Sequence, residues 1–152
     1  MNFKKAEIIM KTIYSHCEED TLAAAAEFAK KLHGGDVVAF RGGMGMGKTV
    51  FVRGCVAALG NDSYVSSPTF SIVNDYGGKI KLYHFDMYRV ESWDSLYSTG
   101  FFDYMNDDSI LFIEWSENIE NVLPENTVYV EFFRGDKDNE RKITISGGDE
   151  NW

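Results

Sequence analysis

The sequence predicts an α/β sandwich with a mixed, partly parallel central sheet. In the N-terminal half, strand-like segments alternate with segments of helical periodicity, as in βαβ units. In the C-terminal half, short alternating segments follow one another with little helix between them, which is typical of antiparallel strands. A chain of 152 residues with 44% hydrophobic residues is long enough for one well-filled core and short for two, so we expect residues 1–152 to form a single domain.

The first predicted strand covers residues 7–14, and an amphipathic helix follows it. Ser15 and Glu18 have the spacing of a capping box, which predicts that the helix opens at Ser15. Lysines at 30–31 fall in the expected last turn, and glycines at 34–35 should end the helix.

The middle of the chain predicts a strand, a helix and a loop. Residues 36–40 (DVVAF) form a short apolar run of strand length. The next helix should begin near Lys48 and stop at Gly60. Ser67 and Pro68 indicate a loop, and the extended-looking residues 69–73 (TFSIV) follow it.

The rest of the chain is predicted mainly as strands. The expected elements are a turn at 77–78, a strand at 79–86, a short helix at 92–97, a strongly apolar strand at 109–115, and an antiparallel pair at 127–133 and 141–145.

The composition limits the classes of function. The formal net charge is −9, and acidic residues are spread along the sequence, which argues against a surface that grips a nucleic-acid backbone by itself. Cys17 and Cys55 lack metal-ligand spacing and suit free thiols in a reducing compartment. The apolar run near the N-terminus is too short for a signal peptide, and no segment has membrane-spanning length. We therefore expect a cytoplasmic protein without a membrane partner.

One segment predicts a phosphate site. Residues 42–49 (GGMGMGKT) fit the spacing G-x-x-x-x-G-K-[ST], with a strand-like run before them and a helix-like run after them. In such a loop, glycines let backbone N–H groups converge on phosphates at the helix N-terminus. Lys48 should lie between the β- and γ-phosphates, and the Thr49 hydroxyl should coordinate Mg²⁺. The alternative is a glycine-rich turn that binds nothing.

The motif defines a P-loop NTPase-like sandwich that holds MgATP or MgGTP. No N-K-x-D segment of the kind common in GTP-binding proteins is present, so ATP is favoured. The residues predicted to bind the nucleotide through this loop are Gly42, Gly43, Met44, Gly45, Met46, Gly47, Lys48, Thr49 and Val50.

Two acids are candidates for the magnesium site that a P-loop requires. Asp86 ends the strand KLYHFD, and Glu114 ends the strand ILFIEW. Each could instead be an ordinary exposed carboxylate at a strand end. Together with the P-loop they predict catalytic residues Lys48, Asp86 and Glu114, and metal ligands Thr49, Asp86 and Glu114.

Four motifs in fixed order resemble one family. The P-loop, SPTF (67–70), HFDMYR (84–89) and IEW (113–115) occur in the order and at roughly the spacing of TsaE proteins. The resemblance covers residues 5–146. It implies the ATPase component of the bacterial machinery that makes threonylcarbamoyladenosine in tRNA, with TsaB and TsaD as partners and tRNA contacted indirectly.

The resemblance also implies roles for single residues. Thr69 resembles a switch I threonine that senses the γ-phosphate or Mg²⁺, Asp86 a switch II acid, and Glu114 a Walker B acid. Trp115 is then a nucleotide-site residue, with a core aromatic as the alternative. His84 fits a packed, hydrogen-bonded histidine better than a catalyst.

The P-loop departs from the family pattern. Relatives commonly carry an acid where this chain has Gly43, and leucine and a small residue where it has Met44 and Met46. If that acid positions water or a partner, this chain should hydrolyse ATP slowly or depend on Asp86 and Glu114.

The combined interpretation is a partner-coupled ATPase, slow when alone, that works as a nucleotide-dependent switch. The alternatives are a small-molecule kinase with Asp86 as general base, and a module that binds nucleotide without turnover. Neither an arginine-bearing lid nor a second substrate cleft is visible in the sequence, which disfavours the kinase. The adenine is expected between residues 18–21 and the strands near Arg141.

Overall fold

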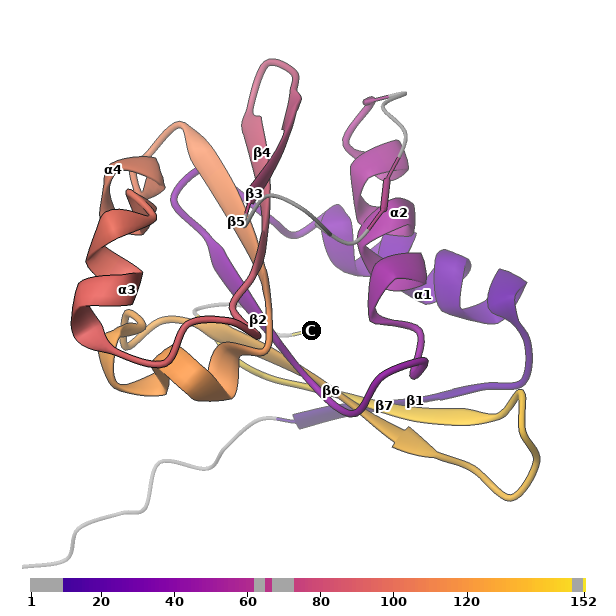
Figure 1. The fold of residues 1–152 in the computed structure, drawn as a ribbon. Helices are drawn as coiled ribbons and strands as arrows, with labels where there is room; N and C mark the ends of the chain where they lie inside the picture. Colours follow the sequence, from indigo (N-terminus) through magenta and orange to yellow (C-terminus); the bar gives the residue numbers. More distant parts are fainter. Residues whose placement is uncertain (1–9, 62–64, 67–72, 149–151) are drawn as a thin grey trace, which may run out of the picture.

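A seven-stranded mixed sheet forms the centre of the molecule in a computed structural model that describes residues 10–61, 65–66, 73–148 and 152 (Figure 1). The strand order is β1-β7-β6-β2-β5-β4-β3. Neighbours from β6 to β4 are parallel, and the pairs β1–β7, β7–β6 and β3–β4 are antiparallel. The strands are β1 (Met10–Ser15), β2 (Val37–Arg41), β3 (Val73–Gly77), β4 (Lys81–Asp86), β5 (Ser109–Glu114), β6 (Val128–Arg134) and β7 (Arg141–Gly147).

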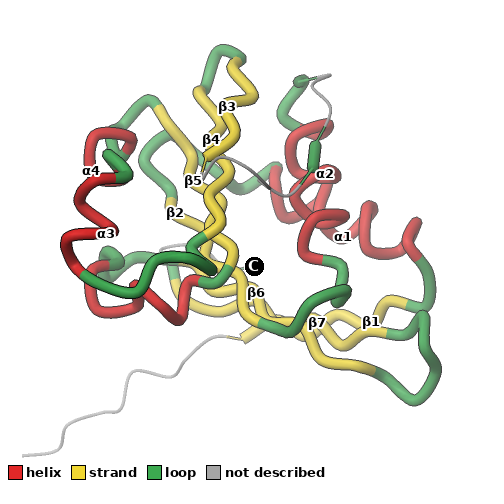
Figure 2. Tube along the Cα trace, viewed as in Figure 1, coloured by secondary structure: helices red, strands yellow, loops and turns green. Residues whose placement is uncertain are grey.

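Helices cover both faces of the sheet, as Figure 2 shows. The two long helices α1 (Glu18–Ala29) and α2 (Lys48–Ala58) lie side by side on one face. The short elements α3 (Trp93–Ser98), α4 (Phe101–Tyr104) and the 3₁₀ helix η1 (Ser116–Val122) lie on the other. The predicted α/β sandwich with a partly parallel sheet is therefore confirmed.

The core is divided by the central strands. On the face of α1 and α2, Phe40 packs against Phe51 and Phe112, with ring centroids 5.9 and 6.3 Å apart. On the other face, Phe85 packs against Phe101 of α4 at 5.2 Å. Strand β5 is buried along its whole length, because both of its faces are covered by helices. This explains why it reads as a continuous apolar run.

The predicted capping box at Ser15 is wrong. Ser15 is the last residue of β1 and pairs with Arg141, so the ladder keeps its backbone extended. Its hydroxyl donates to the Cys17 carbonyl at 2.8 Å and lies 2.7 Å from the Thr21 hydroxyl. The helix instead begins at Glu18, where three acids in the first turn favour the positive end of the helix dipole.

Other boundaries shift by a few residues. Helix α1 ends at Ala29, so the lysines at 30–31 follow the last turn rather than occupy it. Helix α2 ends at Ala58, two residues before Gly60. The sequence did not indicate α4 or η1. Residues 7–9 of the first predicted strand and the loop at 67–72 lie outside the described residues.

The predicted antiparallel pair near the C-terminus is confirmed as β6 and β7, in a register that pairs Val128 with Gly147 and Arg134 with Arg141. In the described part of the chain, no helix combines the length and apolarity needed to cross a bilayer. Cytoplasmic location and single-domain organisation stay predictions.

Candidate functional site

The glycine-rich loop joins the end of β2 to the start of α2. Gly42, Gly45 and Gly47 have φ angles of 132°, 71° and 100°, which side chains rarely adopt. A Cβ atom on Gly42 would also lie 3.0 Å from the Phe132 carbonyl oxygen. The loop conformation therefore depends on glycine at these positions, and its last glycine, Gly47, is the N-cap of α2.

Arg141 holds the loop from the side of β7. Its Nε donates to the Met46 carbonyl and its Nη2 to the Gly45 carbonyl, both at 3.2 Å. The side chain of Met46 is buried in the core, and this burial anchors the same turn. Arg141 was expected near the adenine, and its contact with the loop backbone was not predicted, because no local pattern marks a residue 95 positions away in the chain.

Lys48 is a buried ammonium at the N-terminus of α2. Its side chain is only 6% exposed, and its Nζ donates to the Gly42 carbonyl at 2.9 Å. The same Nζ lies 4.9 Å from the centre of the Trp115 ring. No carboxylate oxygen of the described residues lies within ion-pair distance of it. A buried cation of this kind at a helix N-terminus creates a site for an anion.

The two predicted acids end neighbouring parallel strands. Asp86 on β4 is paired in register with Glu114 on β5, and β2, which leads into the loop, lies on the other side of β5. Since parallel strands place their carboxyl ends at one edge, both acids face the loop region. They close a pocket of about 460 Å³ whose lining is Met44, Gly45, Met46, Gly47, Lys48, Thr49, Val50, Asp86, Glu114 and Trp115.

This pocket brings together most of the predicted site residues. Gly42 and Gly43 begin the same loop but do not line the pocket. Thr69 lies outside the described residues, so its predicted place beside the γ-phosphate stays a prediction.

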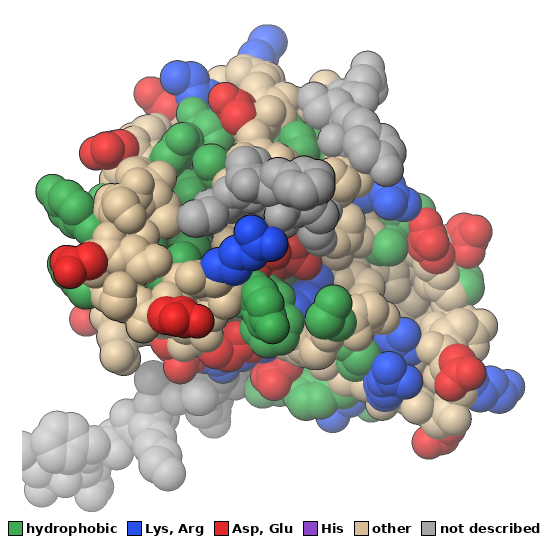
Figure 3. All heavy atoms as spheres, viewed as in Figure 1, with side chains coloured by type: hydrophobic (Ala, Val, Ile, Leu, Met, Phe, Trp, Pro, Cys, Tyr) green, Lys and Arg blue, Asp and Glu red, His purple; other side chains and the backbone are tan. Residues whose placement is uncertain are grey.

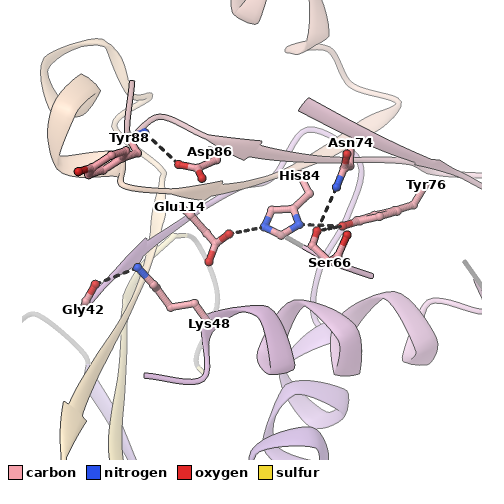
Figure 4. Close-up of polar contacts among 9 residues, drawn as sticks. All are labelled: Gly42, Lys48, Ser66, Asn74, Tyr76, His84, Asp86, Tyr88 and Glu114. Carbon is pink, nitrogen blue, oxygen red and sulfur yellow. Dashed lines mark hydrogen bonds and ion pairs between the residues drawn. The ribbon is translucent and has the colours of Figure 1, made fainter. Parts of the chain in front are cut away.

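The environments of the two acids differ. Glu114 is 5% exposed, and its Oε2 lies 2.9 Å from His84 Nε2. Asp86 is half-buried, and its Oδ1 accepts a hydrogen bond from the Tyr88 backbone N–H at 2.9 Å. Figure 4 shows the Lys48 ammonium turned toward the Gly42 carbonyl and the Glu114 carboxylate turned toward His84. His84 is fully buried and hydrogen-bonded, as expected, but the sequence did not indicate that its partner is Glu114.

Trp115 leaves the strand immediately after Glu114. Its φ of 57° is the only positive value at a non-glycine residue in the described part of the chain. The strand therefore ends one residue earlier than predicted, and the left-handed turn places the indole between Lys48 and Tyr88, whose ring centroid is 5.0 Å away. The next residue, Ser116, fixes the turn by donating to the Phe40 carbonyl at 3.0 Å. Trp115 is thus a pocket residue and is only half-buried.

A second cleft of about 600 Å³ adjoins the pocket at Trp115. Nothing in the sequence indicated this cleft. Its lining consists of Tyr88, Arg89, Val90, Glu91, Trp115 and Asn118.

The region expected to flank the adenine is assembled from distant segments. His16 Nδ1, just before α1, lies 3.5 Å from Glu140 Oε1 in the β6–β7 turn, and Glu18 pairs with Arg53 of α2 at 3.1 Å. The start of α1 and the residues next to Arg141 therefore lie near one another beside the loop. The adenine position itself stays a prediction.

The donor set of the pocket fits a magnesium ion bound together with phosphates. Thr49, Asp86 and Glu114 offer only oxygen ligands, which Mg²⁺ prefers. Within the described ranges, no group of three His, Cys, Asp or Glu residues could hold a metal by itself. In nucleotide sites, Mg²⁺ commonly binds one or two carboxylates and takes its other ligands from phosphates and water.

The glycine loop between a parallel strand and a helix, with two acids at the ends of the neighbouring strands, defines a P-loop α/β protein. Comparison with known proteins places it more closely. The family model for the threonylcarbamoyl adenosine biosynthesis protein TsaE matches residues 15–143. The chain therefore belongs to the TsaE family.

Individual relatives agree with this assignment. The chain is 33% identical to the tRNA threonylcarbamoyladenosine biosynthesis protein TsaE of Treponema pallidum over 132 residues, covering 87% of this chain and 97% of that protein. It is 38% identical to TsaE of Bacillus subtilis over 132 residues, covering 84% and 80%. The crystal structure of Bacillus subtilis YdiB superposes with a TM-score of 0.75 at 28% identity, covering 94% of this chain and 88% of that one.

Proposed function

We propose that this chain binds MgATP in the loop pocket and hydrolyses it as the ATPase component of tRNA threonylcarbamoyladenosine biosynthesis. The observation that carries the proposal is the buried Lys48 ammonium, which has no carboxylate within ion-pair distance among the described residues and shares one pocket with Asp86 and Glu114. A bound polyphosphate would supply the missing negative charge. The family membership supplies the pathway.

In this proposal each pocket residue has the role that its environment suits. Lys48 neutralises charge that develops on the phosphates, and Thr49 contributes a hydroxyl ligand for Mg²⁺. Glu114, buried and held by His84, is the fixed acid of the metal site. Asp86 is more exposed and is suited to orient a water molecule. Magnesium would add the positive charge that the leaving phosphates require.

The partner-coupled switch remains the preferred mode of action. Binding of ATP orders the segments around the pocket, the ordered surface docks on TsaB and TsaD, and hydrolysis resets the complex after each modified tRNA. The surface charge suits an indirect contact with tRNA. On the face shown in Figure 3, acidic side chains are interspersed with basic ones, and the whole chain carries a net charge of −9.

The test is a multiple-turnover assay of threonylcarbamoyladenosine formation on tRNA. Purified TsaB and TsaD receive threonylcarbamoyl-adenylate and MgATP, with this chain, with its Lys48→Ala variant, or with neither. We expect product to continue past one round only with the wild-type chain. Equal product in all three reactions would overturn the pathway proposal and leave the nucleotide pocket to be explained.

The cleft beside Trp115 gives the small-molecule kinase a specific observation in its favour. The exposed Arg89 lines this cleft, which joins the pocket that would hold the terminal phosphate. A kinase would transfer labelled γ-phosphate to an acceptor much faster than to water. The partner-coupled ATPase releases it as inorganic phosphate, and a pure binding module releases none even with partners present.

A further inference from the structure

Three buried side chains form a continuous hydrogen-bonded row behind the candidate metal site (Figure 4). Tyr76 Oη lies 2.7 Å from His84 Nδ1, and His84 Nε2 lies 2.9 Å from Glu114 Oε2. All three residues are less than a tenth exposed, and His84 is not exposed at all. The row leads from β3 across β4 to the carboxylate on β5.

The proton positions in this row follow from the groups themselves. An ionised Glu114 can only accept, so His84 Nε2 donates to it. In a neutral imidazole, Nδ1 then accepts from the Tyr76 hydroxyl. Burial raises the pKa of the Tyr76 phenol, and the negative charge of Glu114 raises this pKa further, so the phenol keeps the proton that it donates.

A local irregularity in β3 puts Tyr76 in this place. The β3–β4 register pairs Asn74 with His84 and then shifts between Asp75 and Gly77, which leaves Tyr76 as the extra residue of a bulge. Bulges re-aim side chains next to functional sites. The Asn61 amide, which follows α2, holds the bulge by donating to the Tyr76 carbonyl at 2.5 Å.

The far end of the row reaches the backbone just before the SPTF segment. The Ser66 carbonyl accepts a hydrogen bond from the Asn74 amide at 3.0 Å and lies 3.2 Å from Tyr76 Oη. Ser66 is the residue directly before Ser67. The Tyr76 hydroxyl has one proton, so His84 Nδ1 at 2.7 Å and the Ser66 carbonyl at 3.2 Å share it as its nearer and farther acceptors. The Ser66 backbone is thus joined to Glu114 through the side chains of Tyr76 and His84.

We propose that His84 is a positioning residue for the metal site, fixing one oxygen of Glu114 so that the other points away from His84, and that Tyr76 holds the His84 ring and ties it to the Ser66 backbone. This inference rests on the proposed nucleotide function. It assigns His84 a role beyond filling the core, because its second nitrogen has its own fixed partner and the carboxylate that it holds lines the nucleotide pocket.

The experiment compares two amide variants that differ in reach. In His84→Gln the amide can extend toward Glu114 as Nε2 does, whereas in His84→Asn it is too short. For each variant we measure the affinity for ATP with Mg²⁺ and with EDTA, the Mg²⁺ concentration for half-maximal hydrolysis, and the melting temperature. Tyr76→Phe, alone and combined with His84→Asn, tests the hydrogen bond between Tyr76 and His84.

We expect His84→Asn to raise the required Mg²⁺ concentration by roughly tenfold or more, the usual effect of removing a hydrogen-bond partner behind a metal ligand. ATP affinity in EDTA should change less than about twofold, since the loop and Lys48 are unaltered. His84→Gln should recover most of the Mg²⁺ affinity. Tyr76→Phe should have a smaller effect, which disappears in the His84→Asn background.

A lowered melting temperature with unchanged Mg²⁺ dependence in both amide variants would overturn the proposal and leave His84 a core residue. The ratio of the ATP affinity with Mg²⁺ to the ATP affinity in EDTA separates this failure from a failure of the proposed function. If the wild-type chain hydrolyses no ATP, the strengthening of nucleotide binding by Mg²⁺ still reports on Glu114. If Mg²⁺ does not strengthen binding by the wild-type chain either, both proposals fail.

Discussion

Asp86 and Glu114 are paired in register on adjacent parallel strands, yet Glu114 is buried against His84 whereas Asp86 is half-buried and bonded to a backbone N–H. A buried carboxylate with a fixed partner has little freedom to move, while a half-exposed one can exchange ligands with water. This difference gives the two acids distinct expected behaviour on substitution.

Neutral amides at the two acids should both remove Mg²⁺-dependent hydrolysis. Glu114→Gln also changes the group that His84 contacts, so it should cost about 1–3 kcal/mol of folding stability. Asp86→Asn keeps an oxygen that can accept from the Tyr88 N–H and should leave stability nearly unchanged. Phosphate release and thermal melts measure both effects. Full activity in either variant removes that residue from the site.

Lys48→Ala should abolish partner-coupled activity without unfolding the protein. The substitution removes a cation from the phosphates, a loss of roughly 3–4 kcal/mol of transition-state stabilisation. The fold should tolerate the change, because the ammonium is buried without a carboxylate in ion-pair distance among the described residues. Lys30→Ala, at the exposed residue directly after α1, is the matched control and should keep both activity and stability. Near-normal turnover by the Lys48 variant would refute the assignment.

Gly43→Asp should speed ATP hydrolysis if an acid at this position helps to place water or a partner. The structure can accept the change, because Gly43 is exposed, its φ is not in the left-handed region, and the nearest contact of an added Cβ is Met46 Cγ at 3.9 Å. Initial rates with and without partners measure the effect. Unchanged rates in a folded variant count against any role for the acid.

The parts of the fold that depend on local patterns could be predicted from the sequence. The loop at 42–49 could be predicted because its glycines come directly before the start of a helix. Strand β5 could be predicted because it is buried on both faces of the sheet, so its sequence is a continuous apolar run. Parallel strands place their carboxyl ends at one edge of the sheet, which is why Asp86 and Glu114 could be predicted as a pair without knowing the sheet order.

The parts that depend on distant contacts could not be predicted. Ser15 has the spacing of a helix cap, but pairing with β7 keeps it in a strand. Arg141 reaches the loop backbone, and His84 reaches Glu114, through contacts that only the folded sheet creates. The sequence predicts Trp115 as the end of a strand. Its left-handed backbone depends on the turn that the Ser116 hydrogen bond to Phe40 fixes.

Trp115 should report nucleotide binding by its fluorescence. Its ring faces the Lys48 ammonium at 4.9 Å, so a phosphate that draws Lys48 toward itself changes the field at the indole. Titration with MgATP should change the emission of the wild-type chain, and Trp115→Phe should lose the signal. Trp93→Phe is the matched control, since Trp93 is exposed on α3 and its ring lies tilted against Phe102, with the ring centroids 5.8 Å apart. An unchanged signal in Trp115→Phe would point to Trp93 or Trp152 instead.

Gly54→Ala should destabilise the fold, although alanine is the better helix former. On α2 an added Cβ at position 54 would lie 2.7 Å from Ala25 Cβ and 2.9 Å from the Leu22 carbonyl oxygen of α1. Such overpacking costs about 1–3 kcal/mol. The better helix propensity of alanine offsets only roughly 1 kcal/mol of this cost, and we expect a net loss of stability because both close contacts are made by α1. The melting temperature should fall by about 2 °C or more for a chain of this size. Ala57→Gly, on the exposed side of the same helix, isolates the propensity effect and should cost about 1 kcal/mol. A rise in melting temperature for Gly54→Ala would mean that α1 can move away from α2 at little cost, and that the loop at the start of α2 is less firmly supported than the packing indicates.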